Sequence, residues 1–132
     1  MRPLVFIWLL WFGIVLFVSF PWIGFTVRPQ WDRLHWVPFS DPADKPRDVI
    51  LNGLLFVPVG VAVSRRRAGV RAIALAALMA ASISVPAEAT QLFSVRRYPS
   101  ATDVLLAIVG ALAGAISTLW IRGSSKPRTW TD

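Results

Sequence analysis

The segment SVPAEATQLF places three polar side chains near the end of a long apolar stretch. Ser84, Glu88 and Gln91 are spaced by four and then three residues, so a helix would present them on one face. A charged residue in the middle of a membrane helix is unfavourable by about 2.5–3.5 kcal/mol, so a carboxyl group there needs a partner or a function. Two interpretations of Glu88 stay open. It forms an ion pair with Arg96 or Arg97 that joins two helices, or it handles a proton or binds a ligand.

Four apolar runs must position these side chains. Of the 132 residues, 55% are hydrophobic, which is too apolar for an ordinary soluble domain of this size. A helix needs about 20 apolar residues to cross a bilayer. We therefore predict an all-α fold, with one membrane domain over residues 1–132 that contains four transmembrane helices and an outer interfacial loop. The predicted helices cover residues 4–27, 48–64, 70–93 and 103–121, and the predicted loop covers residues 28–47.

The directions of these helices predict which side chains lie at the same depth. Consecutive transmembrane helices run in opposite directions, so the start of the second, the end of the third and the start of the fourth share one membrane face. That face should gather a polar cluster from three helices and a loop. The predicted cluster consists of Asn52, Glu88, Gln91, Arg97 and Asp103.

Two features at the fourth predicted helix have structural explanations. Asp103 stands where the helix begins, and Asp is a common N-cap whose charge suits a helix N-terminus. An N-cap role and a catalytic role for Asp103 are both consistent with the sequence. Gly110 and Gly114 form a G-x-x-x-G step, which lets two helix backbones approach closely, so we expect them to serve helix packing.

The distribution of Lys and Arg favours a cytoplasmic location for both termini, by a weak margin of eight residues to six. The polar cluster would then face outward from the membrane. The predicted inner residues are Arg2, Arg65, Arg66, Arg67, Arg71, Arg122, Lys126 and Arg128, and the predicted outer ones are Arg28, Arg33, Lys45, Arg47, Arg96 and Arg97.

Composition also bounds the ligands and partners. The net charge of +7 could suggest nucleic acid, but the basic residues flank apolar runs and so fit membrane orientation; we expect no nucleic-acid partner. The chain has no Cys and a single His, His35, which excludes thiolate and multi-histidine metal sites. We expect no metal and no cofactor. The expected partners are membrane lipids and, in one interpretation, a larger membrane complex.

Two blocks carry a family resemblance. One is WVPF (36–39) followed by DVILNGLLFVPVG (48–60), and the other is EATQLFSVRRYPSATDVLLAIVGALAG (88–114). Together they resemble the VanZ-like family of small bacterial membrane proteins. One position departs, because this chain has Ala107 where that family usually has Asn. The positions that match are Asn52, Phe56, Pro58, Gly60, Glu88, Gln91, Arg97, Asp103, Gly110 and Gly114.

The resemblance implies a fold and a topology more than a reaction. The founding member is linked to low-level resistance to the glycopeptide teicoplanin. The resemblance therefore implies a multi-pass protein of the bacterial cytoplasmic (inner) membrane with a role in the envelope. Three functions remain open. The first is a non-catalytic or ligand-binding membrane protein that acts through the outer polar cluster. The second is an accessory structural subunit of a larger membrane complex. The third is a membrane-surface enzyme acting on a lipid-linked substrate. The enzyme has least support, because no metal motif, nucleophile elbow or phosphate loop is present.

Overall fold

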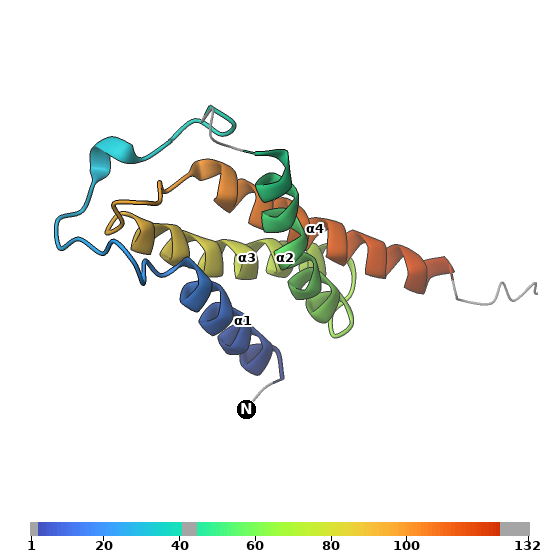
Figure 1. Ribbon diagram of the computed structural model, residues 1–132. Helices are drawn as coiled ribbons and strands as arrows, with labels where there is room; N and C mark the ends of the chain where they lie inside the picture. The colour runs from blue at the N-terminus through green and yellow to red at the C-terminus, as the bar shows by residue number, and fades with distance from the viewer. Residues whose placement is uncertain (1–2, 41–44, 125–132) are drawn as a thin grey trace, which may run out of the picture.

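Four α-helices and one short 3-10 helix make up the computed structural model, which describes residues 3–40 and 45–124 (Figure 1). The all-α class predicted from hydropathy is confirmed. Helices α2, α3 and α4 are long and apolar enough to cross a membrane, whereas α1 is an apolar helix of 17 residues. The elements are α1 (Pro3–Ser19), η1 (Trp31–Arg33), α2 (Pro46–Ser64), α3 (Gly69–Gln91) and α4 (Ala101–Ser124).

Helix α1 ends well before the predicted residue 27. Pro21 lacks a backbone N–H and disfavours the helical conformation at the residue before it, so the helix stops at Ser19. The chain then turns and lies on the end of α3, where the N–H of Thr26 donates to the carbonyl of Phe93 at 2.8 Å. The apolar residues after Ser19 therefore belong to a loop that is hydrogen-bonded to the end of α3, and their large side chains are mostly exposed.

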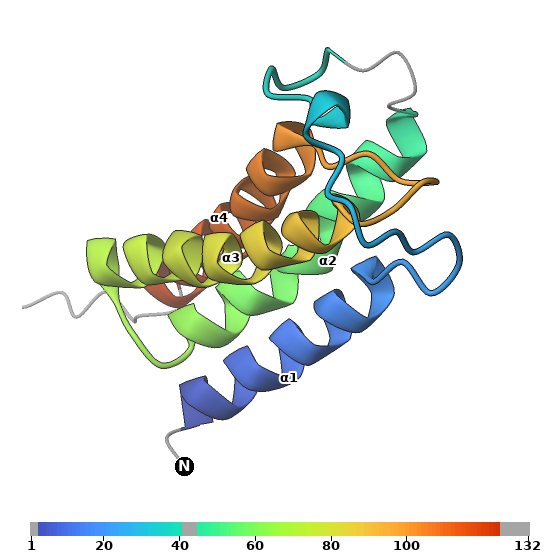
Figure 2. The same cartoon turned by 90° about the vertical axis from the view of Figure 1, so that its left-hand side faces the viewer.

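The long segment between α1 and α2 also holds the turn between α3 and α4. The N–H of His35 donates to the carbonyl of Pro99 at 3.0 Å, and the N–H of Ala101 donates to the carbonyl of His35 at 2.9 Å. Figures 1 and 2 show this segment passing over the end of the bundle where α3 finishes and α4 begins. The predicted outer loop thus fixes the place where the polar residues of three helices meet.

Helices α2 and α4 are in direct backbone contact. A Cβ atom added at Gly110 would collide with the backbone of Gly53, and one added at Gly114 would collide with the backbone of Val57. Only glycine permits such an approach. The G-x-x-x-G step of α4 therefore lies against α2 and sets the position of α4 beside it.

Helix α1 is attached to the other helices through two indole N–H groups. Trp8 donates to the hydroxyl of Ser82 on α3 at 2.8 Å, and Trp11 donates to the carbonyl of Leu55 on α2 at 3.1 Å. Small side chains such as Ala76, which is fully buried in the core, let α3 pack closely against the other helices.

Three of the basic residues whose distribution predicts the membrane orientation lie outside the described residues. They are Arg2, Lys126 and Arg128.

Candidate functional site

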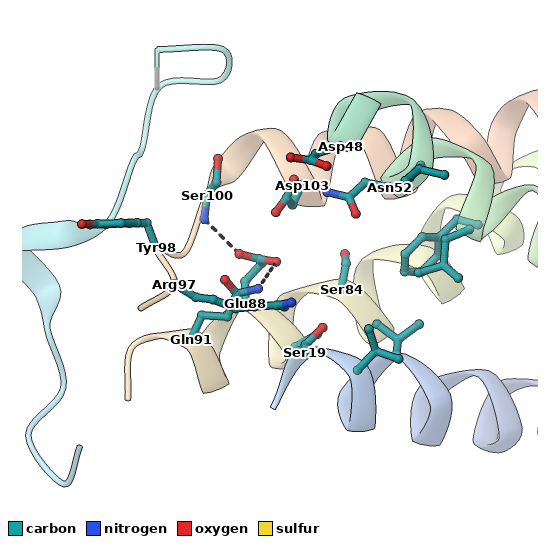
Figure 3. A pocket seen from close by; sticks show the side chains of 16 residues that line it. Ser19, Asp48, Asn52, Ser84, Glu88, Gln91, Arg97, Tyr98, Ser100 and Asp103 are labelled. Atoms are coloured by element: carbon teal, nitrogen blue, oxygen red, sulfur yellow. Dashed lines mark hydrogen bonds between the residues drawn. The ribbon is translucent and has the colours of Figure 1, made fainter. Parts of the chain in front are cut away.

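A cavity of about 440 Å³ lies where the ends of the four helices meet. All five residues of the predicted polar cluster line it (Figure 3). The end of α1, the start of α2, the end of α3 and the α3–α4 turn with the start of α4 all contribute. Its lining consists of Val15, Val18, Ser19, Asp48, Leu51, Asn52, Leu55, Phe56, Ser84, Ala87, Glu88, Gln91, Arg97, Tyr98, Ser100 and Asp103.

The carboxyl group of Glu88 connects α3 to the start of α4. One of its oxygens accepts the backbone N–H of Ser100 at 2.9 Å, and the other accepts the side-chain amide of Gln91 at 3.0 Å (Figure 3). Both donors are neutral. The carboxyl group is therefore held in a fixed orientation at the cavity by hydrogen bonds that do not use an arginine.

A second polar pair connects α2 to α4. The amide of Asn52 donates to a carboxyl oxygen of Asp103 at 2.5 Å. Helix α4 begins at Ala101, so Asp103 lies inside its first turn and does not take the N-cap position, one of the two roles that the sequence left open for it. Ser100 is the residue before the helix, and its hydroxyl accepts the N–H of Thr102 at 3.1 Å. The first turn remains a favourable place for a carboxylate.

Arg97 and Arg96 differ although they are adjacent. The side chain of Arg97 lines the cavity and is close enough to Glu88 to act on it electrostatically, as Figure 3 illustrates. The side chain of Arg96 runs over Gly24 and lines no part of the cavity. Both side chains are exposed. Arg97 is therefore the basic group that a molecule in the cavity would meet.

Ser84 adds a polar atom whose hydrogen-bonding capacity is unused. Its side chain is only 4% exposed, and within the described residues its hydroxyl has no hydrogen-bond partner. Figure 3 shows the hydroxyl pointing into the cavity. A buried hydroxyl without a partner is unfavourable, so its orientation fits a site that receives a polar group or a water molecule.

A second, apolar cavity of about 460 Å³ lies beside the first, between α3, α4 and the loop that carries η1. Glu88 and Ser100 line both cavities. The remaining lining is almost entirely apolar and forms a groove. It consists of Trp31, Leu34, Trp36, Val85, Ala89, Leu92, Pro99, Ala101, Val104, Leu105 and Ile108.

Comparison with sequence models of known families shows to which family this chain belongs. The sequence model of the VanZ/LLP1 family matches residues 4–122. The chain belongs to the VanZ/LLP1 family. No protein with a curated description and no solved structure matches it. Family membership and three helices of membrane-spanning length and hydropathy together indicate a small VanZ-like membrane protein.

This VanZ/LLP1 chain has site residues that sequence reasoning left out of the cluster. Asp48 lies one helical turn before Asn52 on α2, and that spacing could have revealed it. Ser84 shares the helix face of Glu88. Ser100 contributes a backbone N–H, for which the sequence carries no signal.

The one position noted above as departing from the usual family pattern lies in the core of the bundle. Ala107 is 1% exposed in the core of the bundle and lines neither cavity.

Across residues 3–40 and 45–124, no group of three His, Asp or Glu side chains could hold a metal ion.

Proposed function

We propose that this VanZ/LLP1 protein crosses the bacterial cytoplasmic membrane four times, with both termini in the cytoplasm, and binds a ligand in the polar cavity at the outer face. Helix α1 is about 25 Å long at 1.5 Å per residue, close to the lower limit for a membrane span. The start of α1, the α2–α3 turn and the end of α4 lie away from the end of α3 and the start of α4 (Figures 1 and 2), which supports four crossings.

The observation that carries the ligand-binding proposal is the polar cavity itself. Packed helix ends are normally filled by side chains, whereas here a space of about 440 Å³ remains among polar groups from all four helices. Ligand sites typically occupy about 300–1,000 Å³ and place a few polar groups on an apolar wall. The apolar wall is provided by side chains such as Val15 and Phe56, which are buried and line the cavity.

The test compares a variant that fills the cavity with one that adds the same group elsewhere. Ser19→Phe introduces a ring at the cavity, and Ser117→Phe introduces one on the exposed surface of α4, outside both cavities. Each protein is reconstituted in nanodiscs made from bacterial polar lipids and examined by native mass spectrometry. We expect wild type and Ser117→Phe to retain a bound molecule at energies that remove surrounding lipid, and Ser19→Phe to lose it.

The same preparation separates ligand binding from the subunit interpretation. Co-purification of a second protein at fixed stoichiometry in mild detergent, with no small molecule retained by wild type, would support an accessory subunit and overturn the ligand-binding proposal. Retention by wild type that is unaffected by Ser19→Phe would place the bound molecule outside the cavity and overturn it as well.

A further inference from the structure

The polar cavity carries an excess of acidic groups. Among its described lining residues, Asp48, Glu88 and Asp103 bear carboxyl groups and Arg97 bears the opposing charge. The acidic excess persists if any one of the three carboxyl groups holds a proton. Carboxylates in a partly closed cavity repel an anion and attract a cation, because the low-dielectric walls concentrate their field.

Ser84 independently indicates that a hydrogen-bonding ligand group reaches the interior of the cavity. Its hydroxyl is buried, has no partner within the described residues and points into the space that the carboxyl groups surround (Figure 3). A hydroxyl oxygen and carboxylate oxygens all accept hydrogen bonds, and an ammonium group offers three donors and no acceptor. The cavity lining therefore matches an ammonium group in both charge and hydrogen-bonding type.

The position of Arg97 adds a second recognition element at the exposed side of the cavity. A guanidinium binds phosphate through paired N–H donors. A molecule whose ammonium lies among the carboxyl groups could place a phosphate at Arg97, provided that the two charges are separated by a few bonds. That arrangement is the headgroup of a zwitterionic phospholipid.

The apolar groove identifies the source of such a headgroup as a lipid. Glu88 and Ser100 line both the cavity and the groove, so a hydrocarbon chain in the groove ends beside the polar groups of the cavity. Groove residues such as Val85 and Ile108 offer it an almost wholly apolar surface. A soluble amine would make no use of this groove.

We propose that the cavity and groove together bind a phospholipid with a primary ammonium headgroup: the ammonium lies among Asp48, Ser84 and Asp103, the phosphate lies at Arg97 and an acyl chain lies in the groove. This inference rests on the proposed ligand-binding function and names the class of ligand.

The first experiment varies only the headgroup. Wild-type protein is reconstituted in nanodiscs containing equal amounts of phosphatidylethanolamine, phosphatidylcholine and phosphatidylglycerol with identical acyl chains, and retained lipid is quantified by native mass spectrometry. Phosphatidylcholine keeps the positive charge but has no N–H donor, and phosphatidylglycerol has neither. We expect phosphatidylethanolamine to be retained about tenfold more than phosphatidylglycerol, with phosphatidylcholine between them. Free ethanolamine, added at millimolar concentration, should displace little of the retained lipid.

The second experiment uses variants at exposed positions, where folding should be unaffected. Asp48 is exposed, so Asp48→Asn removes one acidic group without disturbing the core, and we expect the preference for phosphatidylethanolamine over phosphatidylglycerol to fall about threefold. Val85→Trp fills the groove, and Val109→Trp adds the same ring at a similarly exposed valine outside both cavities. We expect Val85→Trp to reduce retention of all three lipids and Val109→Trp to retain them as wild type does.

The outcomes distinguish this inference from the function on which it rests. A molecule that is lost in Ser19→Phe but proves to be phosphatidylglycerol, or another anion, would overturn the ammonium assignment while leaving ligand binding intact. Displacement by free ethanolamine, together with no effect of Val85→Trp, would overturn the lipid source and leave a soluble amine. Retention of no molecule at all by wild type would overturn both proposals.

Discussion

The carboxyl group of Glu88 and the backbone N–H of Ser100 are joined by a hydrogen bond of 2.9 Å that ties the last turns of α3 to the residue before α4. The Ser100 side chain is 5% exposed, so this N–H has little access to water if its acceptor is lost. Glu88 therefore has a structural role, and it lies at a cavity where it can also contact a ligand. Substitutions that separate these two roles are the most informative.

Glu88→Gln should preserve folding and reduce ligand binding. The glutamine carbonyl can still accept the Ser100 N–H, whereas the side chain can no longer ionise or offer a second acceptor oxygen to a ligand. Glu88→Ala removes the acceptor as well and should destabilise the fold by about 1–3 kcal/mol, because it leaves a buried donor unsatisfied. Thermal unfolding in detergent measures the stability of both variants, and native mass spectrometry measures their ligand binding. Asp32→Asn, a neutralisation outside both cavities, is the control. Wild-type stability of Glu88→Ala would contradict the structural role.

Arg97→Ala should lower lipid retention about tenfold, because it removes a charge-assisted contact, and Arg96→Ala should not. Since both side chains are exposed, neither substitution should change stability by more than about 1 kcal/mol. Arg97→Lys should restore retention only in part, because an ammonium lacks the planar pair of donors. Equal losses in the two alanine variants would show that general surface charge, and not the position of Arg97 at the cavity, attracts the ligand.

Gly110→Ala should destabilise the bundle by about 1–3 kcal/mol, because the added methyl group collides with the backbone of Gly53 and forces α2 and α4 apart. Gly13→Ala is a matched control, since a Cβ atom at Gly13 meets nothing within 4 Å. Unfolding midpoints of the two variants in the same detergent provide the comparison. A midpoint for Gly110→Ala that equals that of the control would show that the two backbones are less closely packed than the structure describes.

The membrane orientation can be tested with single cysteines, because the natural chain has none. Ser100 is too buried to be labelled, so we select Val95, which is 46% exposed near the cavity, and Ala68, which is exposed in the turn between α2 and α3. In intact cells an impermeant maleimide should label Val95→Cys, and it should reach Ala68→Cys only after the membrane is opened. The opposite pattern would invert the protein and place the cavity in the cytoplasm.

The sequence by itself determined the features that depend on local composition. Apolar runs located the four helices, and alternating helix directions predicted that Asn52, Glu88 and Asp103 would lie at one end of the bundle. The four-residue spacing of Gly110 and Gly114 indicated a tightly packed face. These features could be predicted because hydropathy and helical periodicity act within about two turns of chain.

Only the tertiary structure decided which groups pair with one another. The carboxyl group of Glu88 accepts a hydrogen bond from the backbone N–H of a residue 12 positions away, and the amide of Asn52 donates to Asp103 across 51 positions. The groove exists because α1 ends at Ser19 and the loop after it passes over the α3–α4 turn. The path of that loop and the close approach of α2 and α4 are set by packing between distant segments, and a backbone N–H such as that of Ser100 has no side chain to reveal it in a sequence.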